Sequence, residues 1–181
     1  MLAAVFGLTG IASAQAGSAS GTLTQNGKTV KLRSAIAVWD PAENELTIGL
    51  FPFAVNRSDV DTMRDSGALF VASGKPSPDI SKWSSPPFAE LTIEFAPGTH
   101  TISREKVAYY ALHVSWLDKM NHTLSANRNY QEEVKREFST LRGTTGSGGT
   151  VELSSRGVEQ FNGGDRLSWD FRVQATLERG R

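Results

Sequence analysis

The stretch 166–177, RLSWDFRVQATL, decides the fold because its side chains alternate strictly between apolar and polar. The apolar set comprises Leu167, Trp169, Phe171, Val173, Ala175 and Leu177, and the polar set comprises Ser168, Asp170, Arg172, Gln174 and Thr176. A period of two is the signature of a β-strand with one buried and one solvated face. Strands of this kind belong to antiparallel sheets that are covered on one side.

The same alternation recurs through the chain from Gly21 onward. It is carried by Leu46, Ile48 and Leu50, by Leu91, Ile93 and Phe95, and by Tyr110, Leu112, Val114 and Trp116. Turn residues separate these runs. The sequence therefore predicts a mainly β protein, an antiparallel β-sandwich or open barrel of about seven to nine strands with one or two short helices.

Local signals place the turns and the helices. Asn26-Gly27 is a strong hairpin signal, and 40–44 reads as a second turn. A short helix is expected over 58–66, where Ser58 can cap the first turn. In 129–142 the apolar residues fall at helical spacing, so we expect a helix there, with a strand from Phe138 as the alternative.

The first sixteen residues, MLAAVFGLTGIASAQA, are typical of a secretory signal peptide. Ala14 and Ala16 supply the small side chains that a signal peptidase accepts. No Lys or Arg precedes the apolar run, which leaves open a wrongly assigned start or an ordinary buried N-terminus. We expect 17–181 to form a single domain in the periplasm or outside the cell, with no stable membrane span.

Composition excludes several classes of function. Nineteen Lys and Arg balance nineteen Asp and Glu, so the chain lacks the positive field that nucleic acid binding requires. The chain has no cysteine, which excludes disulfides, thiolate metal sites and a Cys nucleophile. No sequence motif calls for a cofactor.

The titratable residues do not form a recognisable catalytic or metal motif. His100, His113 and His122 lack the spacing of two that places paired ligands on one strand face, so no metal site is expected. Glu90 and Glu94 lie roughly 13 Å apart along one strand, too far for glycosidase chemistry. No serine stands in a Gly-x-Ser-x-Gly elbow.

The tryptophans separate into core residues and candidate ligand-binding residues. Trp116 and Trp169 lie on apolar strand faces and are expected in the core. Trp39 falls on the face opposite Ile36 and Val38, and Trp83 lies in the proline-rich loop 74–87. An exposed aromatic ring stacks well on sugars or on a partner's apolar surface, so Trp83 and Trp39 are the candidate binding residues. The alternative for Trp83 is an anchor that pins the loop.

Three features occur together along the chain. Gly21-Thr22-Leu23-Thr24 precedes Asn26-Gly27-Lys28, 45–50 is followed by Phe51-Pro52-Phe53, and Gly149-Thr150-Val151-Glu152-Leu153 precedes the closing strand. This arrangement resembles small exported bacterial β-sandwich domains of uncharacterised function. The resemblance implies a β-sandwich and no particular catalytic residue.

Two functions follow as hypotheses. The first is an exported, non-enzymatic domain that binds a protein, a glycan or another component of the cell envelope. The second is a hydrolase or metal-dependent enzyme whose site is assembled from distant residues. The enzyme hypothesis requires a concave pocket that holds a histidine with a carboxylate within hydrogen-bond reach.

Overall fold

The computed structural model describes residues 17–55, 88–115, 121–127, 136–146, 148–160, 164 and 166–180, with the backbone alone at 88, 113, 115 and 121–127. The strands are β1 (Gly17–Gln25), β2 (Lys28–Lys31), β3 (Ser34–Asp40), β4 (Glu45–Phe51), β5 (Phe88–Phe95), β6 (Thr101–Ser103), β7 (Val107–Ser115), β8 (Asn121–Asn127), β9 (Phe138–Thr144), β10 (Thr150–Gln160) and β11 (Arg166–Arg179). A 3-10 helix, η2 (Arg104–Lys106), joins β6 to β7.

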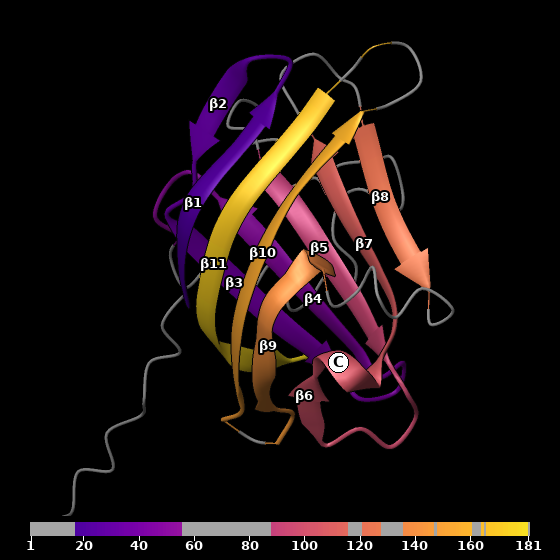
Figure 1. Ribbon diagram of the computed structural model, residues 1–181. Coiled ribbons are helices and arrows are strands. Elements are labelled where there is room, and N and C mark those ends of the chain that lie inside the picture. Colours follow the sequence, from indigo (N-terminus) through magenta and orange to yellow (C-terminus); the bar gives the residue numbers. More distant parts are fainter. Residues whose placement is uncertain are drawn as a thin grey trace, which may run out of the picture.

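All of these strands belong to one sheet that curls into a nearly closed barrel (Figure 1). The strand order is β6-β9-β10-β11-β1-β3-β4-β5-β7-β8, and β2 pairs with β1 outside this path. Pairing is antiparallel except where the end of β11 runs parallel to β3. The predicted mainly antiparallel β fold, in its open-barrel form, is confirmed. The described residues form eleven strands, more than the seven to nine expected. The alternation does not reveal β2 and β6, because strands of four and three residues are too short to show a period.

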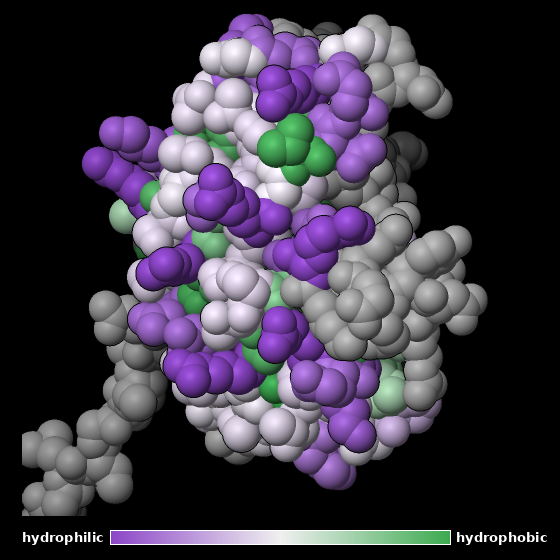
Figure 2. Space-filling view, viewed as in Figure 1, coloured by the Kyte–Doolittle hydropathy of each residue, from purple (hydrophilic) through white to green (hydrophobic). Residues whose placement is uncertain are grey.

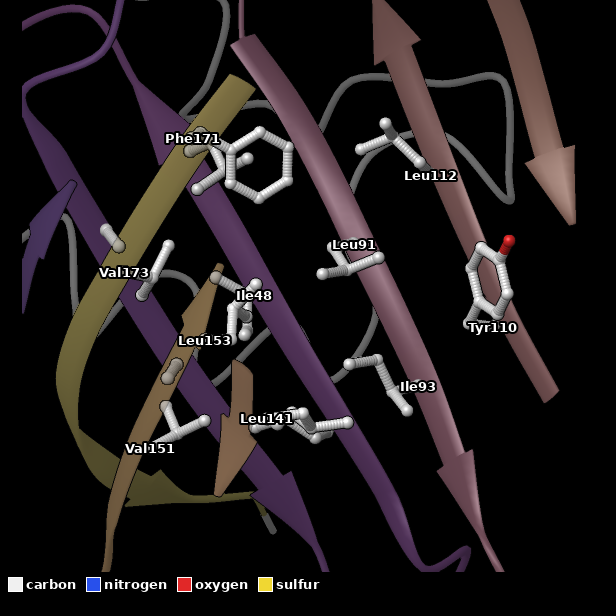
Figure 3. Close-up of a cluster of buried hydrophobic side chains, with 14 of the residues drawn as sticks. Ile48, Leu91, Ile93, Tyr110, Leu112, Leu141, Val151, Leu153, Phe171 and Val173 are labelled. Atoms are coloured by element: carbon white, nitrogen blue, oxygen red, sulfur yellow. The ribbon is translucent and has the colours of Figure 1, made fainter. Parts of the chain in front are cut away.

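The core fills the space between two walls of the barrel. In Figure 3, side chains of β9, β10 and β11 meet those of β4, β5 and β7. Phe138 of β9 packs edge-on against Tyr110 of β7, with ring centroids 5.1 Å apart. The alternation in β11 has the expected sense, since its apolar set points inward and is buried.

The two predicted turns have the expected geometry. Asn26 and Gly27 both adopt positive φ, of 49° and 80°, as a tight hairpin between β1 and β2 requires. The Asp40 carboxylate accepts hydrogen bonds from the backbone N–H groups of Ala42 (2.8 Å) and Glu43 (3.3 Å). These bonds fix the turn between β3 and β4.

The expectation that Trp39 lies on an exposed face is wrong. Its side chain is 5% exposed and packs on Phe95 at 5.8 Å, in the core with Ala35 and Ala37. The alternation that begins with Leu32 in the core does not continue into β3, because Leu32 and Arg33 lie between strands. This break shifts the inward-facing positions by one residue, so Ala35, Ala37 and Trp39 face the core instead of Ile36 and Val38.

The expected helix over 129–142 is also wrong where the structure describes it. Arg136 and Glu137 are helical, but the chain then enters strand β9. A bulge lies here, since Ser154 pairs with Thr140 whereas Ser155 pairs with Phe138. The bulge lets Phe138 and Leu141 both point inward at a spacing of three, which imitates a helical pattern.

Several expectations concern residues outside the described part. They are the signal peptide 1–16, the short helix 58–66, the loop 74–87 with Trp83, residues 129–135, and Trp116. Within the described residues, no helix has the length and apolar character needed to cross a membrane.

Candidate functional site

A hollow of about 970 Å³ opens at the end of the barrel where β11 terminates. Four stretches that are distant in the sequence form its wall: the β3–β4 turn, the β5–β6 loop, the β9–β10 loop and the end of β11. The lining residues are Trp39, Pro41, Asn44, Gly98, Thr99, His100, Thr144, Thr145, Gly146, Gly148, Leu177, Glu178 and Arg179.

The parallel contact between β11 and β3 brings the end of β11 and the β3–β4 turn together at the hollow. Leu177, Glu178 and Arg179 pair with Ala37, Val38 and Trp39, and the Gly180 N–H donates to the Trp39 carbonyl at 2.8 Å. The last residues of β11 therefore lie beside the β3–β4 turn and cannot swing away from it without breaking sheet hydrogen bonds.

Thr145 holds the remaining two loops together. Its N–H and its hydroxyl both approach the His100 carbonyl at 3.3 Å, and the hydroxyl also lies 3.5 Å from the Thr99 carbonyl. Within the β5–β6 loop, the Thr99 hydroxyl donates to the Ala96 carbonyl at 2.5 Å. Because these bonds use backbone carbonyls, they leave the His100 imidazole facing solvent beside the hollow.

The glycines of the β9–β10 loop allow a close approach of three backbone segments. The Gly149 N–H donates to the Gly146 carbonyl and the Leu177 N–H donates to the Gly149 carbonyl, both at 2.7 Å. A Cβ at Gly149 would lie 2.1 Å from the Thr144 carbonyl oxygen, so only glycine fits there. This loop is thereby tied to β11 at the rim of the hollow.

The lining of the hollow is mixed, with apolar surface beside a small number of polar groups. Hydroxyls of the threonines, the exposed His100 imidazole and the exposed Arg179 side chain supply hydrogen-bond donors and acceptors. Trp39 lines the hollow, but at 5% exposed it closes the floor and presents little surface for stacking. Such a lining suits a hydroxylated ligand that is held by several directional hydrogen bonds.

The structure does not bring the candidate histidines together as a described site. His100 lies at the hollow, whereas the backbones of His113 and His122 lie on β7 and β8, where His122 pairs with Val114. Among the described residues, no group of three His, Asp or Glu side chains is placed to hold a metal ion. Trp83, the other candidate binding residue, lies outside the described residues.

Glu90 is a buried carboxyl group that the sequence pattern assigns to a solvated face. It is 4% exposed, its Oε1 accepts a hydrogen bond from Thr92 at 3.3 Å, and its Oε2 has no hydrogen-bond partner among the described residues. Burial raises the pKa of Glu90 to about 7, and nearby Glu45 adds to the rise against the lowering effect of Thr92.

The surroundings of Glu90 correct the expectation of a sheet that is covered on one side only. On the outward side of β3, β4 and β7, the residues Ile36, Val38, Thr47 and Ala111 are also buried. Glu90 pairs with Gly49 on one side and with His113 on the other. An alternating pattern identifies the two faces of a strand but does not show whether the polar face is exposed to solvent. No signal in the sequence therefore indicated that the Glu90 carboxyl group is buried.

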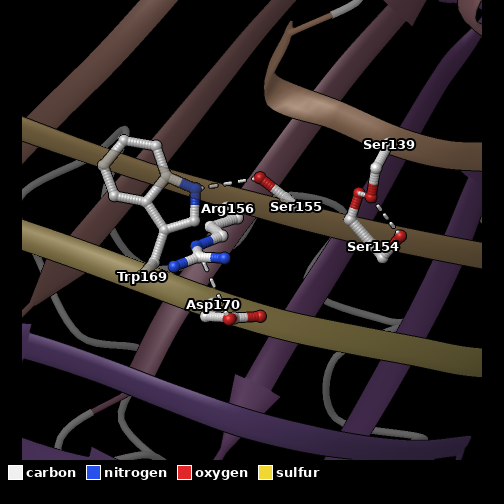
Figure 4. A network of polar contacts seen from close by, with 6 residues as sticks. All are labelled: Ser139, Ser154, Ser155, Arg156, Trp169 and Asp170. Atoms are coloured by element: carbon white, nitrogen blue, oxygen red, sulfur yellow. Dashed lines mark hydrogen bonds and ion pairs between the residues drawn. The ribbon is translucent and has the colours of Figure 1, made fainter.

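The outward face of β9, β10, β11 and β1 is strongly polar (Figure 2). Two ion pairs cross it, Arg142 with Glu152 at 2.6 Å and Arg156 with Asp170 at 3.8 Å. Figure 4 shows the second pair beside the Ser139–Ser154 hydroxyl contact of 2.7 Å. This face is exposed to solvent, as the alternation in β11 predicts.

Comparisons with known proteins found no match for the chain among family models, curated proteins or solved structures.

Proposed function

We propose that the chain is an exported, non-enzymatic binding domain that holds a glycan of the cell envelope in the hollow at the end of the barrel. The observation that carries the proposal is the hollow itself, a concavity of about 970 Å³ whose wall combines apolar surface with threonine hydroxyls, an imidazole and a guanidinium group. Sugar hydroxyls are recognised by such groups through pairs of directional hydrogen bonds.

The shape favours a compact ligand over a protein surface. Stable protein interfaces bury about 800 Å² on each partner and are usually centred on aromatic anchors. The aromatic residue at this site, Trp39, is buried at the floor and cannot act as such an anchor. A glycan chain end of two or three sugars fits the hollow better than a flat protein face does.

Export is the second part of the proposal and depends on the sequence. The leader-like segment 1–16 and the lack of cysteine suit a protein that works in the periplasm or outside the cell. The resemblance of the chain to small exported bacterial β-sandwich domains also supports export. The balanced charge argues for an uncharged or mixed partner instead of nucleic acid.

Hydrolysis is the alternative function, because His100 does lie in a concave site that Glu178 also lines. General acid–base catalysis needs the two groups to act together within about 3 Å or through one water. The hydrogen bonds that the structure gives for His100 use its backbone carbonyl, which accepts from Thr145. The geometry therefore supports binding better than hydrolysis.

A binding experiment with two rim variants tests the proposal. Soluble peptidoglycan fragments and capsular oligosaccharides are titrated calorimetrically into the mature chain and into His100→Ala and Arg179→Ala. Each side chain is exposed, so folding is expected to be unchanged, and the loss of one or two hydrogen bonds predicts about a tenfold weaker Kd.

Arg166→Ala is the matched control, because Arg166 begins the strand that Arg179 ends and is equally solvent-exposed. It is expected to bind like the unaltered chain. Binding that is unaffected by both rim variants, or equally weakened by the control, would contradict a site in the hollow. Cleavage of the oligosaccharide that stops in His100→Ala would favour the hydrolase instead.

A further inference from the structure

We propose that Arg172 forms an anion-binding site on the outward face of β1, β9, β10 and β11, which takes a carboxylate or phosphate group such as an acidic sugar carries. A groove of about 490 Å³ lies here, separate from the hollow at the end of the barrel. It is lined by Ser18, Ser20, Ser139, Thr140, Glu152, Leu153, Ser154, Arg172, Val173 and Gln174.

Strand register explains why the groove exists. Arg172 stands between Ser20 of β1 and Ser154 of β10, which are its direct cross-strand neighbours. Serine side chains are short, so they leave space on both sides of the long arginine. Two residues further along β11, on the same face, Gln174 stands between Ser18 and Glu152 and closes that side of the groove.

The charges around Arg172 leave its guanidinium uncommitted. Glu152 accepts two hydrogen bonds from Arg142, at 2.6 and 2.9 Å, and Asp170 pairs with Arg156. No ion pair or hydrogen bond of the described residues satisfies the Arg172 side chain. Because no acid occupies the cross-strand positions beside Arg172, an incoming anion need not displace an internal partner.

The guanidinium and the surrounding hydroxyls together match an oxyanion. Arginine presents parallel N–H donors that fit two oxygens of a carboxylate or phosphate. Among the described residues, the hydroxyls of Ser18 and Ser20 have no side-chain partner and can donate to the same group, whereas the hydroxyls of Ser139 and Ser154 are joined to each other at 2.7 Å. An anion here would thus receive charge-assisted hydrogen bonds from β11 and neutral ones from β1.

The groove also has room for more than a single ion. A second hollow of about 850 Å³ shares Ser18, Glu152 and Gln174 with it and extends toward β6. The space therefore suits an anion that is attached to a larger polar body, such as a sugar ring. The groove around Arg172 shares no lining residue with the end hollow, so this inference does not depend on the function proposed above.

Nuclear magnetic resonance titrations test the proposal with three probes: inorganic phosphate, glucuronate and glucose. We expect phosphate and glucuronate to shift the Arg172 side-chain signal and the amides of Ser20 and Ser154, and glucose to shift none of them. A lower Kd for glucuronate than for phosphate would identify the acidic sugar as the source of the anion, and the reverse order would identify free phosphate.

Variants separate this site from general attraction to positive charge. Arg172→Gln is expected to weaken the anion's Kd at least tenfold, and Arg172→Lys to restore part of it. The matched control is Arg156→Gln, which removes the same charge from the neighbouring strand on the same face and is expected to change the Kd less than twofold. The proposal is overturned if neither anion binds, if Arg172→Gln binds the anion with the unaltered Kd, or if Arg156→Gln weakens the Kd as much as Arg172→Gln does.

Discussion

Glu90 places a carboxyl group where the outer face of the sheet is buried. Its Oε2 lacks a hydrogen-bond partner among the described residues, so the ionised form is poorly stabilised and the carboxyl group stays protonated up to a pH of about 7. A carboxyl group whose pKa is about 7 when folded and near the ordinary 4.5 when unfolded links stability to pH. Burial raises the pKa of Glu45 as well, so its effect has the same sign.

The direction of this pH dependence follows from proton counting. Between pH 4.5 and about 7 the folded state binds more protons than the unfolded state, so the free energy of unfolding falls as pH rises. The full stabilisation is present below pH 4.5, and on the order of 3 kcal/mol is lost by pH 8. Urea unfolding of the unaltered chain and of Glu90→Gln at pH 5 and pH 8 measures this change in the free energy of unfolding. Glu90→Gln should lose most of this difference, and an equally steep fall in the variant would contradict the assignment.

At the scale of elements, the pairing of β10 with β11 is organised around Trp169. Its indole Nε1 donates to the buried Ser155 hydroxyl at 2.9 Å, and a Cβ at Gly157 would lie 2.2 Å from the indole ring. Gly157 thus leaves the space that the ring fills. This contact joins the longest strand to its most extensively paired neighbour.

Truncation of this tryptophan should be among the costly core substitutions. Trp169→Ala is expected to lower the free energy of unfolding by roughly 3–5 kcal/mol, because it leaves a large cavity and an unpaired Ser155 hydroxyl. Val158→Ala, on β10 with a side chain 57% exposed, should cost less than about 0.5 kcal/mol and serves as control. Chemical denaturation measures both, and a loss below about 1 kcal/mol for Trp169→Ala would contradict its place in the core.

The elements also show how far the sequence pattern reaches. Period-two alternation identified β4, β5, β7 and β11, and turn chemistry identified the Asn26-Gly27 hairpin. The alternation predicted the wrong structure where the backbone departs from regular pleating. The bulge in β9 gave that strand the spacing of a helix, and the break before β3 reversed the expected face of Trp39.

At the scale of the molecule, closure of the sheet creates sites that no single segment encodes. Trp39, His100, Thr145 and Arg179 meet at one end of the barrel because β11 crosses to β3 and Thr145 ties the β5–β6 loop to β9. The sequence analysis considered Trp39 as a candidate stacking residue and His100 as a possible metal ligand, and nothing in it placed the two residues together. Their common position depends on long-range strand order, which local periodicity does not contain.

The claim that the end hollow is the binding site is tested most directly by mapping amide shifts on the whole domain. A uniformly ¹⁵N-labelled chain of residues 17–181 is titrated with the oligosaccharide that binds best in calorimetry. We expect saturable shifts concentrated in 98–100, 144–149 and 177–180, the segments that border the hollow. Saturable shifts confined to the outer faces of the sheet, or to the opposite end around Asn26, would contradict it.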